Sequence, residues 1–336
     1  MRKILRGRRK AATLIVLAVL TAGLMVYGQQ GEGNPFLDQS DTGEVIHVLP
    51  GPAAVHSPHA TQPSFAPPQS GASVFPASYG NGNLSYHGGN VMTAPQFYAI
   101  YWNSAVANSQ ATSLGYATLQ NQVAAFIGTF FNGTSYTGSM IDDYSIVGQY
   151  GDSGGRQPVP TGGGLAGQLL DTKSAQATIK DSAIQSYISG LLQSGKLPVD
   201  VHGVYGVYFP SGMRISLRGG SSCSSFCGYH SHFSYNGAPI KYAVFPYPDC
   251  SACKLSALTV ADMLTIVSSH EIRESVTDPG ESNKNAWYDQ SGYEADDKCA
   301  WHNLYQLNRT TGLNFWVQPE YSNGGNGYPG PGCVKP

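Results

Sequence analysis

Six cysteines restrict the fold of this 336-residue chain more than any other feature, and all of them lie beyond residue 220. An even number of cysteines indicates three disulfides if the chain folds in an oxidising compartment. The spacings Cys223-x3-Cys227 and Cys250-x2-Cys253 also suit a zinc knuckle. The choice between the two interpretations depends on where the protein folds.

The N-terminus has the pattern of an export signal over residues 1–28. Met1–Lys10 carries six basic residues and no acidic one, and Ala11–Tyr27 carries no charge. A basic segment followed by a short apolar one is typical of a signal peptide. A retained anchor is the alternative, because the apolar run is near the lower limit for spanning a bilayer. In both cases we expect the rest of the chain outside the cytoplasm, with membrane contact only through an uncleaved N-terminal segment.

Export favours disulfides over the zinc knuckle. We therefore predict a secreted, disulfide-stabilised protein with three disulfides. The sequence leaves the pairing open. Our prediction is that four cysteines pair among themselves and that the last two pair with each other: Cys223, Cys227, Cys250 and Cys253 in the first group, Cys299 and Cys333 in the second.

Composition divides the remaining chain into a linker and one domain. Residues 29–83 are rich in Pro, Ser and Gly with almost no aliphatic run. We predict that they are disordered, because such a segment buries too little surface to offset its ordering entropy. Residues 84–336 are then a single globular domain. The net charge of −2 and the lack of a basic run beyond the signal argue against a nucleic-acid partner.

The hydrophobic pattern of that domain predicts an α+β fold with a mixed or antiparallel sheet and three main helices. Helical spacing occurs at residues 112–131, 175–195 and 258–277. Strand patterns occur at residues 96–102, 144–150, 201–209 (with 213–217 as a hairpin partner), 241–246 and 314–318.

The helix over residues 258–277 carries the most informative pattern. At about 100° per residue, His270 and Glu274 fall within about 20° of the centre of its apolar stripe, and Glu271 falls at the edge. A carboxylate that faces a core is costly unless it is paired or binds a metal. The i, i+4 spacing also resembles the zincin helix, His-Glu-x-x-His, whose middle Glu is the general base. Here Glu274 replaces the second His, and Glu is an accepted zinc ligand.

We therefore predict His270 and Glu274 as metal ligands and Glu271 as the general base. Asp297, in the loop beyond the helix, is the first choice for the third ligand. The reserve candidates for that position are Glu294, Asp296, His230 and His232. The structural alternative is that Glu274 pairs with an arginine such as Arg214 or Arg218 and that His270 bonds to a backbone carbonyl.

A series of motifs runs through roughly residues 84–334: Tyr86–Thr93, Ile100–Trp102, Cys223-x3-Cys227-Gly-Tyr-His230, Cys250-x2-Cys253, Ser269-His270-Glu271-x-x-Glu274-x-x-Thr277 with Pro279, and Glu294-x-x-Asp297-x-Cys299. In these motifs the chain resembles the Exordium, or phosphate-induced, protein family of plant cell walls and its bacterial relatives. Asp278 stands where plant members tend to have Asn, which favours the bacterial branch. The resemblance implies location outside the cell or in the cell wall, and no settled activity.

Two functions fit these patterns. The first is a secreted metal-dependent hydrolase, most simply a zinc metallopeptidase, in which Glu271 takes a proton from the attacking water and delivers it to the leaving amine. The second is a non-catalytic Exordium-like protein of the cell wall, or one that binds carbohydrate, with a structural metal site. One His and two carboxylates favour Zn²⁺ but also accept Mn²⁺ or Ca²⁺. The expected partner is a peptide or a cell-wall polymer.

Overall fold

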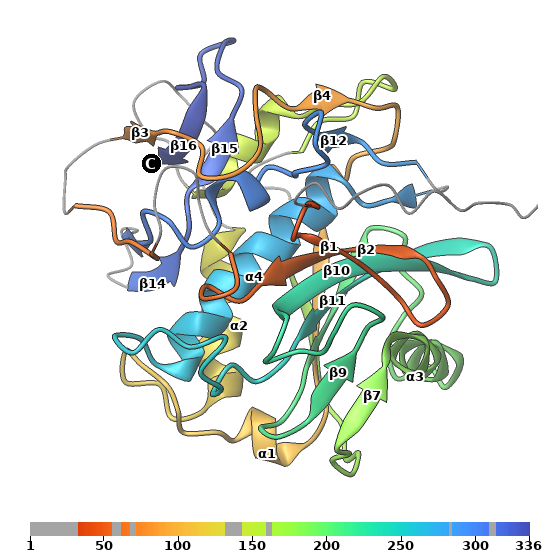
Figure 1. Cartoon of the computed structure of the whole chain (residues 1–336). Helices are drawn as coiled ribbons and strands as arrows, with labels where there is room; N and C mark the ends of the chain where they lie inside the picture. The colour runs from red at the N-terminus through yellow and green to blue at the C-terminus, as the bar shows by residue number, and fades with distance from the viewer. Residues whose placement is uncertain are drawn as a thin grey trace, which may run out of the picture. The chain divides into compact units, whose positions relative to one another are not determined.

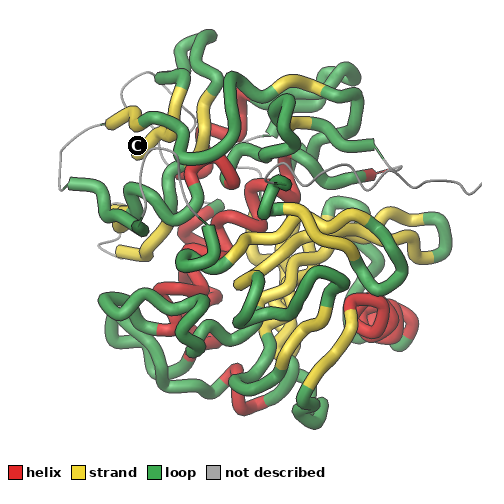
Figure 2. The backbone as a smooth tube through the Cα atoms, in the orientation of Figure 1, coloured by secondary structure: helices red, strands yellow, loops and turns green. Residues whose placement is uncertain are grey.

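One seven-stranded sheet forms the framework of the fold. The computed structural model describes residues 33–55, 62–67, 72–131, 143–158, 163–281, 284–308 and 314–336. The strands of the sheet, from one edge to the other, are β1 (Leu37–Gln39), β2 (Val45–Pro50), β10 (Phe226–Tyr235), β11 (Ala238–Phe245), β8 (Gly203–Tyr208), β5 (Gln96–Tyr101) and β6 (Gly164–Leu170) (Figures 1 and 2).

The sheet is mixed, as predicted. From β1 to β11 each neighbouring pair is antiparallel. From β11 through β8 and β5 to β6 each pair is parallel. The central strands β5 and β8 are buried almost throughout, which suits their near-continuous apolar and aromatic sequences.

Three long helices accompany the sheet, also as predicted, together with short helical turns. These elements are α1 (Ser104–Ala107), α2 (Leu119–Phe130), α3 (Asp181–Gln193), α4 (Val260–Thr277) and the 3-10 turns η1 (Asp143–Gln149) and η3 (Asp297–Cys299). The helices α2 and α3 begin later than the pattern predicts. Thr118 caps α2, and the residues just before α3 form the short strand β7 (Thr178–Lys180).

Side chains of β10 alternate between the two faces of the sheet. Tyr229 points to α3 and donates a hydrogen bond to Asp181 over 2.7 Å. The side chain of His230 and the Cβ position of Gly228 face the other way, toward α4, because side chains alternate along a strand. Helix α4 therefore lies against the face of the sheet that carries His230.

Helix α4 is buried along its whole length. Thr259 and Asp262 form a reciprocal capping box at its start. All eighteen residues of α4 are buried, between β10 and β11 on one side and β14 (Asn314–Val317) on another. The prediction that Glu271 lies at the edge of an apolar stripe is therefore wrong, because this helix has no solvent-facing side.

Small sheets and disulfides complete the fold. The smaller pairings are β4 (Ser85–Tyr86) with β12 (Trp287–Tyr288), β13 (Tyr305–Asn308) with β14, β7 with β9 (Arg214–Ser216), and β3 (Ser73–Phe75) and β15 (Glu320–Ser322) on either side of β16 (Gly332–Lys335). The disulfides are Cys223–Cys250, Cys227–Cys253 and Cys299–Cys333, which confirms the predicted grouping.

The predicted disordered linker over residues 29–83 is wrong where the structure describes it. Strand β2 pairs with β10, and Ile46, Val48 and Leu49 are buried in the core. Asn34–Pro336 forms one compact unit, so the domain predicted to start near residue 84 also includes the described residues from Asn34 onward. The composition of residues 29–83 as a whole did not indicate the six-residue strand β2, because the segment on its C-terminal side is rich in Pro and Ser.

Two further element predictions differ from the structure. The predicted strand over residues 144–150 is wrong: residues 144–149 belong to the 3-10 turn η1, and Tyr150 follows it. A short apolar run fits either state. Strand β9 pairs with β7 in parallel and not with β8 as a hairpin. The predicted signal or anchor over residues 1–28 lies outside the described residues. Within the described part, no helix combines the length and apolar character of a membrane span.

Candidate metal centre

The structure brings the three predicted ligands together. His270 Nε2 lies 3.1 Å from Glu274 Oε2 and 3.5 Å from Asp297 Oδ1. Helix α4 supplies the first two residues one turn apart, and η3 supplies Asp297. One nitrogen or oxygen atom from each residue lies within 4.8 Å of the other two. All three side chains are buried.

Backbone hydrogen bonds fix the two carboxylates. The backbone N–H of Asp297 donates to Glu274 Oε1 over 3.0 Å, and the backbone N–H of Glu294 donates to Asp297 Oδ2 over 3.0 Å. The remaining Asp297 oxygen, Oδ1, is buried without a hydrogen-bond partner, and so are both ring nitrogens of His270. Buried polar atoms rarely stay unpaired in proteins. The convergence of His270 Nε2, Glu274 Oε2 and Asp297 Oδ1 fits a cation, which would take one atom of each side chain as a ligand.

Glu271 lies between the helix and strand β10. Both of its carboxylate oxygens are buried without a hydrogen bond. A Cβ placed on Gly228 would lie 2.9 Å from Glu271 Oε1 and 2.4 Å from Val267, so this close approach of helix and strand requires a glycine. Glu271, Glu274 and His230 have donor atoms within 4.8 Å of one another, so the predicted base borders the predicted ligands.

Two histidines of the sheet join the group. His47 on β2 and His230 on β10 are paired directly across the two strands, with ring centroids 5.9 Å apart. His47 Nδ1 and His230 Nε2 each lie 3.0 Å from the same atom, Glu294 Oε2. His230 and Glu294 were reserve candidates, whereas His47 was missed. Its only sequence signal is the apolar run Val45–Pro50 around it.

Asp278 connects this group to the surface. It caps the C-terminus of α4 and accepts a hydrogen bond from the backbone of Ala286 over 2.7 Å. Its Oδ2 is buried without a hydrogen-bond partner. Only one of its two carboxylate oxygens therefore takes part in the turn at the end of the helix. We call the eight residues the His/carboxylate cluster: His47, His230, His270, Glu271, Glu274, Asp278, Glu294 and Asp297.

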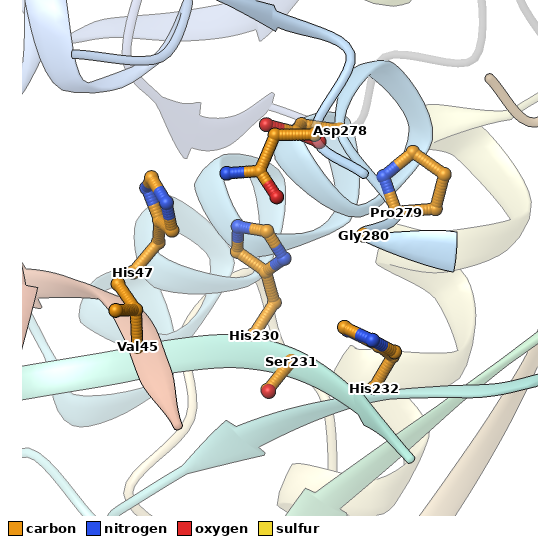
Figure 3. A pocket seen from close by; sticks show the side chains of 9 residues that line it. Val45, His47, His230, Ser231, His232, Asp278, Pro279 and Gly280 are labelled. Carbon is orange, nitrogen blue, oxygen red and sulfur yellow. The ribbon is translucent and has the colours of Figure 1, made fainter. Parts of the chain in front are cut away.

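A cavity of about 60 Å³ opens beside the cluster, and His47, His230 and Asp278 line it (Figure 3). His232 and Gly280 form another part of the wall. Gly280 has φ +66°, and a Cβ there would lie 2.5 Å from His232 Nδ1. The cluster thus has one side toward a cavity, while His270 lies completely buried behind it.

The structural alternatives for His270 and Glu274 are not supported. Among the described residues neither Arg214 nor Arg218 forms an ion pair with Glu274, and Arg218 donates a hydrogen bond to Gln39. Neither ring nitrogen of His270 bonds to a carbonyl.

The basic residues nearest the cluster have acidic partners of their own. Arg273 pairs with Asp296, and Lys298 pairs with Asp289 over 2.7 Å. Asp296, another reserve ligand, is therefore engaged by an arginine. The positive charges next to the cluster in sequence are thus directed away from it.

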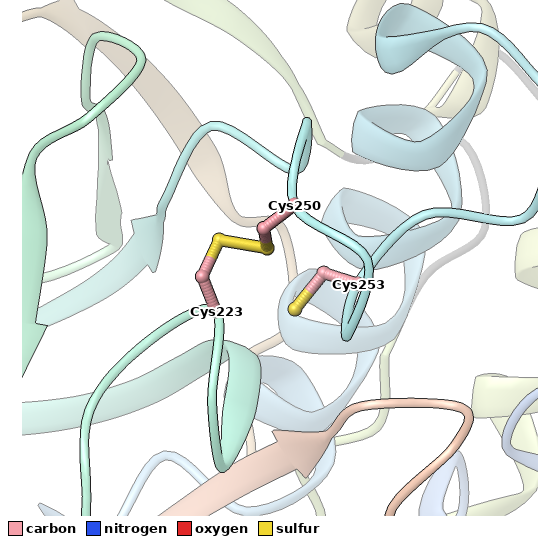
Figure 4. A group of neighbouring side chains, drawn as sticks. All are labelled: Cys223, Cys250 and Cys253. Carbon is pink, nitrogen blue, oxygen red and sulfur yellow. A yellow bond between two sulfur atoms is a disulfide. The ribbon is translucent and has the colours of Figure 1, made fainter.

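Other catalytic chemistries find no support in the described part of the chain. Every cysteine is in a disulfide, which excludes both a thiol nucleophile and the zinc knuckle. Figure 4 shows the Cys223–Cys250 disulfide with Cys253 beside it. The string Gly151–Gly155 fits Gly-x-Ser-x-Gly, but it forms a turn held by the Asp152 side chain. Ser153 Oγ contacts the Tyr86 hydroxyl over 3.2 Å and no histidine. The base that a serine nucleophile requires is absent there.

Burial and mutual repulsion shift the ionisation of the cluster when no metal is bound. Burial, together with neighbouring carboxylates, raises the pKa of Glu271 and of Glu274 well above the ordinary value. Burial opposes charge on the histidines, but Glu274 raises the pKa of His270, and Glu294 raises the pKa of His47 to about 9. In spite of its burial, Glu294 has a lowered pKa because it faces His47 and His230.

These shifts predict that the metal-free protein is more stable at pH 5.5 than at pH 8. The folded state then holds more protons on Glu271, Glu274, His47 and His270 than the unfolded state does, so stability falls as pH rises through this window. Glu294 acts in the opposite sense only below its unfolded pKa of 4.5. Melting curves of chelator-treated protein at the two pH values measure the effect. The metal-loaded protein should show the reverse order, because protons compete with metal for the ligands. Equal melting temperatures of the metal-free protein would contradict the prediction.

Comparisons with known proteins found no match for this chain. No family model matches this chain, and neither the search of curated proteins nor that of solved structures gave a match. The fold and the site therefore define only a class: a disulfide-bonded α+β protein with a buried His/carboxylate cluster beside a cavity. The Exordium resemblance stays a prediction.

Proposed function

We propose that this protein is a secreted metal-dependent hydrolase, similar to a zinc metallopeptidase. The observation that carries the proposal is the convergence of His270, Glu274 and Asp297 with buried atoms that lack hydrogen-bond partners. Donors of this kind suit Zn²⁺, and the oxygen-rich set also accepts Mn²⁺ or Ca²⁺. The disulfides agree with folding in an oxidising compartment.

The proposed chemistry assigns different tasks to neighbouring residues. A divalent cation held by His270, Glu274 and Asp297 supplies Lewis-acid polarisation of a carbonyl and lowers the pKa of a water. Glu271 accepts the proton of the attacking water and delivers it to the leaving group. Burial and the neighbouring carboxylates raise the pKa of Glu271, which makes its carboxylate a stronger proton acceptor than an exposed one. The cavity lined by His47 and His230 is the proposed entrance for a peptide or cell-wall polymer.

One observation favours a second function, a non-catalytic cell-wall protein with a structural metal. His270, Glu274 and Asp297 are at most 1% exposed, and a catalytic metal needs an open coordination position. We propose that this chain is a relative of the Exordium family, and such a relationship agrees with either function.

Metal-dependent hydrolysis tests the proposal directly. We expect protein reconstituted with Zn²⁺ to hydrolyse an unstructured peptide mixture or a cell-wall polymer. The rate should be at least about tenfold above that of the EDTA-treated protein, since a Lewis acid contributes several kcal/mol to such reactions. Product release measured by amine or reducing-end detection, with Mn²⁺ and Ca²⁺ in parallel, gives the readout. Stoichiometric metal without hydrolysis of any substrate would favour the structural function.

A further inference from the structure

The His/carboxylate cluster contains more negative groups than one divalent cation balances. Five of its members are carboxyl groups, each at most 3% exposed: Glu271, Glu274, Asp278, Glu294 and Asp297. In the described part of the chain no lysine or arginine forms an ion pair with any of them. A buried charge without compensation costs several kcal/mol. One divalent ion bound at His270 offsets two of these charges, and on the cavity side the groups that face Glu294 are His47 and His230, which can bind a metal when neutral.

A second set of donors lies on that side. His47, Glu294 and Asp297 each contribute an atom within 4.8 Å of the other two. Asp297 also belongs to the first set, with His270 and Glu274. Glu294 Oε1 and His47 Nδ1 are buried without a hydrogen bond, although His47 Nδ1 is only 3.0 Å from Glu294 Oε2. One cation could therefore take His47 Nδ1 and a Glu294 oxygen as ligands.

The second set differs from the first in its access to solvent. His47, His230 and Asp278 line the cavity, and the His47 side chain keeps 12% of its surface exposed (Figure 3). His270 has no exposed surface. An ion held by His47 and Glu294 would therefore border open space, as a catalytic ion requires.

We propose that the cluster binds two divalent cations, bridged by Asp297. His270 and Glu274 hold the inner ion, His47 and Glu294 hold the outer one, and His230 stands beside the outer ion. Carboxylate-bridged pairs of ions about 3.5–4 Å apart are common in hydrolytic enzymes, where they stabilise both the attacking and the leaving oxygen. This inference rests on the proposed metal centre and assigns the substrate-facing role to the outer ion.

Metal stoichiometry of the full chain tests the inference. After dialysis against Zn²⁺ and removal of free metal, elemental analysis should give two ions per chain for the parent. The variant His47→Ala should give one ion, and the control His202→Ala, which changes an exposed histidine, should keep two. Replacing Zn²⁺ by Mn²⁺ should give the spin-coupled paramagnetic resonance spectrum of a bridged pair in the parent and an uncoupled spectrum in His47→Ala.

The outcomes separate this inference from the proposed function. One ion in the parent that persists in His47→Ala overturns the outer site but leaves the inner metal centre. No ion in the parent overturns both. If His47→Ala fails to fold, the parent stoichiometry and the parent Mn²⁺ spectrum still decide, because an uncoupled single ion contradicts a bridged pair.

Discussion

Replacing Glu271 by glutamine should lower hydrolysis by roughly 10²–10⁴-fold, the usual contribution of a general acid–base residue. Glutamine keeps the size of the side chain but accepts no proton. Glu271 makes no hydrogen bond that the substitution would break, and the space against Gly228 stays filled. Metal content and melting temperature should therefore remain close to those of the parent.

Turnover, metal content and melting temperature are measured on the same preparation of Glu271→Gln. The matched control is Glu44→Gln, which changes an exposed glutamate on the loop before β2 and should leave all three quantities unaltered. If Glu271→Gln retains full activity, Glu271 is not the base. If the variant loses its metal, Glu271 is a ligand, which would agree with its place beside His230 and Glu274.

The second prediction with a large expected effect concerns the stability of variants that lack a ligand of the inner metal. We expect His270→Ala and Glu274→Ala to lose the inner metal and to unfold more easily, because metal binding is coupled to folding. A ligand present at about a thousand times its dissociation constant stabilises the folded state by about 4 kcal/mol. For a protein of this size, that corresponds to a melting temperature lower by roughly 10 °C.

The chelator supplies the decisive comparison. EDTA should lower the melting temperature of the parent substantially but should have little further effect on His270→Ala. The control is His302→Ala, which removes a buried histidine outside the cluster that contacts the Tyr79 hydroxyl over 3.3 Å. That variant should lose stability through its cavity yet keep its full response to EDTA. A parent that never contains metal, with His270→Ala as stable as the parent, would rule out the metal centre.

The local part of the site was predictable from the sequence. The i, i+4 pair His270 and Glu274 follows from helix geometry alone, and Asp297 could be chosen because Cys299 fixes its loop nearby. The grouping of the cysteines followed from their positions along the chain, whereas the two pairs within the first group came only from the structure. Each of these inferences uses residues that are close in sequence or joined by a covalent bond.

The parts of the site that could not be predicted depend on strand pairing and packing between segments that are distant in the sequence. His47 meets His230 only because β2 pairs with β10 in one register, and a shift of one residue would turn His47 to the opposite face. The sequence of β2 contains no signal for its partner or its register. The burial of Glu271 likewise depends on β10, β11 and β14 packing around α4, which helical periodicity cannot show.

The span of the cluster along the chain has a consequence for the timing of metal acquisition. Its donors extend from His47 to Asp297, and the loop that carries Asp297 is tied by Cys299 to Cys333, three residues before Pro336. Chains emerge from the ribosome N-terminus first, and contacts between distant segments form late in folding. The complete set of donors therefore exists only after the chain has been made as far as Cys333 and the Cys299–Cys333 disulfide has closed. A nascent chain offers isolated histidines that bind metal weakly, so the ion should enter a protein that has already finished folding.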